Sequence, residues 1–63
     1  MDKQLEELAR TYLESRYRAV KMPSMAELCN KNAEDAATRA TKLGYTSAQW
    51  MAAVNAVNAK MKN

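Results

Sequence analysis

The 63-residue chain lacks histidine, phenylalanine and isoleucine, and it holds one residue each of cysteine, glycine, proline and tryptophan. Histidine is the usual general acid or base near neutral pH, so its absence argues against an enzyme. One cysteine forms no internal disulfide, and without histidine or a cysteine cluster we expect no metal site. A single glycine excludes a glycine-rich phosphate loop. We therefore expect no catalytic residue, no cofactor and no small-molecule substrate.

Long apolar runs are also missing. Residues 1–20 carry charges throughout and contain no apolar stretch typical of a signal peptide. No run approaches the roughly 18 apolar residues that indicate a membrane-spanning helix. A lone cysteine without a disulfide framework is typical of a reducing compartment. The sequence thus predicts a cytoplasmic protein without a membrane partner.

Two helix-start signals lie beside the only proline and the only glycine. Ser24 precedes Glu27 by three residues, and Thr46 precedes Gln49 by three. This spacing lets the N-cap and N3 side chains satisfy each other's backbone N–H groups. The signals predict one small helical domain over residues 1–63, an all-α three-helix bundle with helices at about 2–20, 24–43 and 46–61. The second helix is either continuous or broken near 30–32, where weak helix formers follow one another.

Each predicted helix carries an apolar stripe at three- and four-residue spacing. The stripes are Leu5, Leu8, Ala9, Tyr12, Leu13, Tyr17 and Val20; then Met25, Leu28, Cys29, Ala33, Ala36, Ala40 and Leu43; then Trp50, Ala53, Val54, Val57 and Met61. Cys29 lies on such a stripe, which predicts an inert buried thiol; the alternative is an exposed thiol that crosslinks two chains. Met51 lies off its stripe and is expected to be exposed.

The predicted core is thin. Alanine occurs twelve times, whereas leucine and valine together occur eight times. A chain of this size seldom gains more than about 3–5 kcal/mol from one core, and natural ones often add a partner. We therefore expect a non-enzymatic protein-interaction module, a small regulatory, accessory or inhibitor protein of the kind common in phages and mobile elements. It would bind a larger protein or form a homodimer, with Tyr12, Tyr17, Trp50 and Met51 as interface residues.

The charge pattern supports an alternative function. In an antiparallel arrangement, the ends of the first and third helices share one pole, although the net charge is only +3. This pole would gather Arg16, Arg18, Lys21, Lys60 and Lys62. Such a patch attracts phosphate groups and predicts a small nucleic-acid-binding protein. Basic residues at helix C-termini also complement the helix dipole, which is the simpler interpretation.

Overall fold

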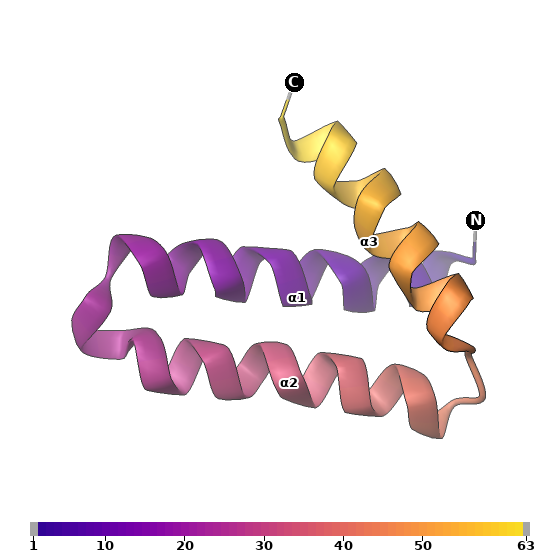
Figure 1. The fold of residues 1–63 in the computed structure, drawn as a ribbon, viewed down its shortest axis with the longest axis horizontal. Coiled ribbons are helices and arrows are strands. Elements are labelled where there is room, and N and C mark those ends of the chain that lie inside the picture. Colours follow the sequence, from indigo (N-terminus) through magenta and orange to yellow (C-terminus); the bar gives the residue numbers. More distant parts are fainter. Residues whose placement is uncertain (1, 63) are drawn as a thin grey trace.

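The structure is a computed structural model that describes residues 2–62. Its elements are α1 (Lys3–Lys21), a short 3-10 turn η1 (Pro23–Met25), α2 (Ala26–Lys42) and α3 (Ser47–Met61). α1 and α2 form an antiparallel hairpin, and α3 crosses α1 obliquely (Figure 1). The predicted all-α fold of three helices is confirmed, and α2 runs unbroken through residues 30–32.

Two of the three α-helices begin with a side-chain cap. At α1, Asp2 is the N-cap, and its Oδ1 accepts a hydrogen bond of 2.9 Å from the backbone N–H of Gln4. At α3, the Thr46 hydroxyl accepts from the Gln49 backbone N–H at 3.1 Å, and Gln49 Oε1 accepts from the Thr46 N–H at 2.8 Å. This reciprocal pair is a capping box, as the sequence predicted.

The prediction of a second capping box, from Ser24 to Glu27, is wrong. An N-cap residue needs a non-helical backbone, and Ser24 instead lies inside η1. The Met25 N–H donates to the Met22 carbonyl at 2.9 Å within this turn. Pro23 suits the first position of η1 because its ring fixes φ, and because a backbone N–H at that position would have no hydrogen-bond partner within the turn. α2 consequently begins at Ala26, two residues later than predicted, without a side-chain cap.

The link from α2 to α3 is a Schellman ending. Gly44 has φ +99°, a left-handed conformation that favours glycine. Its N–H donates to the Thr41 carbonyl at 3.1 Å, and the Tyr45 N–H donates to the Ala40 carbonyl at 3.2 Å. The Tyr45 hydroxyl then donates to Asp2 Oδ2 at 2.6 Å. This bond fixes the start of α3 beside the start of α1.

The core lies where α3 meets α1 and the C-terminal part of α2. It consists of Leu5, Ala9, Leu13, Ala40, Ala53 and Val57, and the half-buried Leu8, Tyr12, Tyr45, Trp50 and Val54 pack around it. Half of the six central residues are alanine, so the core is as thin as the composition predicted. α2 turns Cys29 and buried alanines toward the interior. Cys29 is 4% exposed, which confirms the prediction of a buried thiol.

The three helices leave the hairpin partly uncovered. α3 packs mainly on α1 and barely contacts α2. The molecule measures 33 × 29 × 16 Å, and its radius of gyration is 11.5 Å, against about 10.6 Å for a compact chain of this length. Figure 1 shows η1 at the end of the hairpin that α3 does not reach. The closed end of the hairpin and one of its faces therefore stay open to solvent.

Candidate interaction surfaces

Several large apolar side chains lie outside the core. The exposed ones are Tyr17, Val20, Met22, Met25, Leu28, Leu43, Met51 and Met61. Val20, at 80% exposure, stood on the predicted inward stripe of the first helix. Ala19 in the same turn is buried at 8% exposure, so Val20 lies on the side of the last turn of α1 that no helix covers. Met51, at 63% exposure, confirms the prediction that it lies off the packed face.

The four predicted interface residues fall into two groups. Tyr12 and Trp50 pack against each other with ring centroids 5.5 Å apart and an interplanar angle of 77°, an edge-to-face pair. Both rings are half-buried against the core and hold α3 onto α1. Tyr17 and Met51 remain exposed. The structure thus uses Tyr12 and Trp50 for its own packing, and Tyr17 and Met51 lie on separate helices without a contact that unites them.

Tyr17 lies in a hollow between the end of α1 and the end of α3. We call this hollow the terminal hollow; its lining residues are Glu14, Tyr17, Arg18, Lys21, Met22 and Met61. The Tyr17 hydroxyl donates a hydrogen bond to the side-chain oxygen of Asn58, which fixes its ring between the two helices. Met22 and Met61 are 44% and 36% exposed. The hollow therefore combines an apolar floor with two cationic side chains.

The predicted basic pole is divided. Lys60 Nζ lies 3.2 Å from Glu6 Oε1. Glu6 is near the start of α1, at the pole opposite to the one at which Lys60 was predicted. The Arg16 guanidinium lies 5.8 Å from the centroid of the Tyr12 ring, in cation–π range. Arg18 and Lys21 line the terminal hollow, and Lys62 follows α3 as an exposed residue. The prediction that five cations gather at a single pole is therefore corrected. α3 crosses α1 at an angle, so the Lys60 side chain lies beside Glu6 instead.

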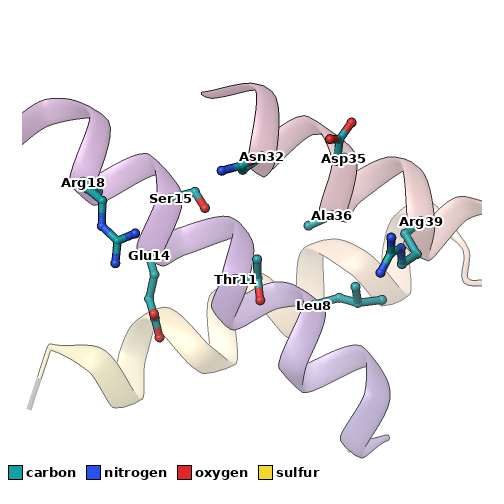
Figure 2. A pocket seen from close by; sticks show the side chains of 9 residues that line it. All are labelled: Leu8, Thr11, Glu14, Ser15, Arg18, Asn32, Asp35, Ala36 and Arg39. Atoms are coloured by element: carbon teal, nitrogen blue, oxygen red, sulfur yellow. The ribbon is translucent and has the colours of Figure 1, made fainter. Parts of the chain in front are cut away.

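A second hollow runs along the hairpin between α1 and α2. We call it the hairpin groove, and all of its lining residues come from these two helices: Leu8, Thr11, Glu14, Ser15, Arg18, Asn32, Asp35, Ala36 and Arg39. Figure 2 shows Ser15 and Asn32 near its middle, with Arg18 and Arg39 toward its opposite ends. The middle is lined by small side chains, whereas charges of both signs line its edges.

Electrostatic perturbation is concentrated at the start of α1. The hydrogen bond from Tyr45, and next the one from the Gln4 N–H, lower the pKa of the Asp2 carboxyl. The same Tyr45–Asp2 bond, with some desolvation, raises the pKa of the Tyr45 hydroxyl. Both groups belong to the capping and loop contacts described above. The shifts of Asp2 and Tyr45 therefore arise from contacts that hold the fold together.

Among residues 2–62, no cluster of histidine, cysteine, aspartate or glutamate is arranged to hold a metal ion. Within the same range, no helix has both the length and the apolar character needed to cross a membrane.

The sequence did not predict that Val20, Leu28, Leu43 and Met61 are exposed, because helical spacing assigned all four to the apolar stripes. Helical spacing carries no signal of this exposure, because it does not specify which part of a stripe another helix covers.

Comparison of the chain with protein-family models, with curated proteins and with solved structures finds no match. The case for function therefore rests on the two hollows and on the exposed side chains.

Proposed function

We propose that the protein is a non-enzymatic interaction module that holds a larger protein at the terminal hollow. The observation that carries this proposal is the exposed apolar set of Tyr17, Met22 and Met61 in a hollow bounded by Arg18 and Lys21. Methionine side chains adapt to differently shaped surfaces, and aromatic rings and methionine are enriched in interface centres. This composition is typical of a binding site rather than of ordinary solvent-exposed helix.

Charge defines the chemistry of the partner. From Arg16 to Ala26 the sequence holds three cations and no acidic residue. Among residues 2–62, Glu14 is the only acidic residue that lines the terminal hollow. Opposite charges across an interface speed association and exclude wrong partners. The partner is accordingly a protein segment with apolar side chains that enter the hollow and carboxylates that meet Arg18 and Lys21.

The experiment is capture from a lysate of the source cells with three forms of the chain. Met22→Asp places a charge in the hollow, whereas Met51→Asp makes the same change at an exposed methionine of α3 outside it. We expect wild type and Met51→Asp to capture the same protein and Met22→Asp to lose it, with nuclease treatment changing nothing. Circular dichroism of both variants checks that each is folded. Equal capture by Met22→Asp and wild type would overturn the proposal.

Binding of nucleic acid at the same end is the rival function. Arg18, Lys21 and Lys62 remain available for phosphate contacts, whereas Lys60 is paired with Glu6 and Arg16 lies over a ring. Three phosphate contacts predict only a shallow dependence of affinity on salt, with a slope near −3 on a log–log plot. Capture that disappears after nuclease treatment, and titration of duplex and single strands with that slope, would favour this rival over a protein partner.

A further inference from the structure

The methionine side chains that the structure describes all lie outside the core. They are Met22, Met25, Met51 and Met61, and they are 36% to 63% exposed. Among residues 2–62, the core and the half-buried side chains packed on it include no methionine. A dissolved oxidant therefore reaches these four side chains, and a chemical change at any of them removes no core contact.

Two of these methionines meet in one place. Met22 follows α1 and Met61 is the last residue of α3, and both line the terminal hollow. The backbone of Met22 is held in place, since its N–H donates to the Arg18 carbonyl at 2.8 Å and its carbonyl accepts from the Met25 N–H at 2.9 Å. The two thioethers thus belong to the apolar floor of the hollow, although they come from opposite ends of the chain.

The thiol of the chain is shielded from the same oxidant. Oxidation of sulfur follows its exposure, and an accessible cysteine thiolate usually reacts before a thioether. Cys29 is 4% exposed on the inner side of α2. Its burial leaves the exposed thioethers as the sulfur atoms that meet an oxidant first.

We infer that Met22 and Met61 form a modification site, at which hydrogen peroxide converts the thioethers to sulfoxides and so prevents the terminal hollow from holding its protein partner. This inference rests on the proposed function and adds its regulation. In each reaction the sulfur lone pair bonds to one peroxide oxygen, the O–O bond breaks and, after proton transfer, water leaves. Sulfur loses two electrons and the peroxide gains two. Methionine sulfoxide reductases reverse the change.

Oxidation alters the hollow in two ways. A sulfoxide is polar, so it opposes the burial of an apolar partner side chain against it. The sulfoxide oxygen is also a hydrogen-bond acceptor, and Arg18 and Lys21 line the same hollow as donors. An acceptor within the molecule then competes with the carboxylates of the partner for these two cations. Binding is lost while the fold remains, because the core contacts are unchanged.

Capture from a nuclease-treated lysate of the source cells tests the inference, and the probe is the protein that the untreated chain retains. The wild-type chain is treated with hydrogen peroxide, separated from it and mapped by mass spectrometry. We expect sulfoxide at Met22 and Met61 to raise the apparent dissociation constant for that protein at least about tenfold. Methionine sulfoxide reductases A and B are expected to restore the original constant. The urea midpoint of the oxidised chain, followed by circular dichroism, is expected to equal that of the untreated chain.

Matched substitutions locate the effect. Met25→Leu with Met51→Leu removes two exposed thioethers outside the hollow, and this variant is expected to respond to peroxide as wild type does. Met22→Leu with Met61→Leu keeps apolar side chains of similar volume but removes the sulfur. Its dissociation constant, at whatever level the substitutions set, is expected to be the same before and after peroxide.

The outcomes separate this inference from the proposed function. An oxidised wild-type chain that binds as tightly as the untreated chain would overturn the inference alone. So would a loss of binding that the reductases do not reverse, an equal loss in Met22→Leu with Met61→Leu, or an oxidised chain that unfolds. An untreated chain that retains no protein would overturn the proposed function, and the inference with it.

Discussion

Two leucines with opposite environments test how the domain is held together. Leu13 is 8% exposed within the core, whereas Leu28 is 55% exposed on α2. Truncating a buried leucine to alanine removes its transfer free energy and leaves a cavity, so Leu13→Ala is expected to cost about 3 kcal/mol. Leu28→Ala removes a side chain already largely in water, and its cost is expected to be about 0.5 kcal/mol or less in the monomer.

The assay is urea unfolding followed by circular dichroism at low protein concentration. A domain of this size has a urea dependence near 1 kcal/mol per molar, so Leu13→Ala lowers the midpoint by about 3 M. Since the whole domain holds only about 3–5 kcal/mol, this variant is partly unfolded without urea. Leu28→Ala keeps a midpoint close to that of wild type. Equal midpoints for the two variants would refute the assignment of the core to the α1–α3 contact.

Three further changes test the caps and the loop. Thr46→Ala removes the capping box of α3 and is expected to cost about 1 kcal/mol, read from the urea midpoint; a neutral result would contradict the cap. In Gly44→Ala the added Cβ meets no atom within 4 Å, yet the φ of +99° strains any residue with a side chain. We therefore expect a loss of about 1 kcal/mol in the free energy of unfolding from the backbone alone, and a stabilised variant would contradict this.

Tyr45→Phe removes the hydroxyl that lowers the Asp2 pKa below its ordinary 3.8 and whose own pKa is raised above 10.0. The hydrogen bond makes wild type more stable than this variant between pH 3.8 and pH 10.0. This difference in stability disappears as the pH falls through the lowered Asp2 pKa, because the carboxylate is then protonated. It also disappears as the pH rises through the raised Tyr45 pKa, because the hydroxyl is then deprotonated. Thermal melts across pH measure this difference, and a difference independent of pH would be inconsistent with the bond.

The sequence was sufficient to predict the three helices because their starts and ends depend on local chemistry. Thr46 and Gln49 are three residues apart, and the structure has their capping box as predicted. Gly44, with its positive φ, ends α2 by contacts that are equally local. Ser24 with Glu27 has the same spacing and fails. Pro23 favours the 3-10 turn η1, and Ser24 inside this turn does not have the backbone conformation that an N-cap needs.

The placement of the exposed apolar residues depends on the tertiary arrangement. Helical spacing assigned Val20, Leu28 and Leu43 to packed stripes, but spacing alone does not specify which part of a stripe another helix covers. The crossing of α3 over α1 decides that, and it depends on packing between residues far apart in the sequence. The same crossing brings Lys60 to Glu6 and so divides the basic residues.

The central claim is that the apolar side chains outside the core form contact surfaces for other protein chains. Oxidative footprinting of the methionines tests it most directly, with the chain labelled once in buffer and once in a lysate of the source cells. Met22 and Met61 are expected to react in buffer and to become protected in the lysate, while Met51, outside the terminal hollow, stays reactive in both. Unchanged reactivity of Met22 and Met61 in the lysate would contradict it.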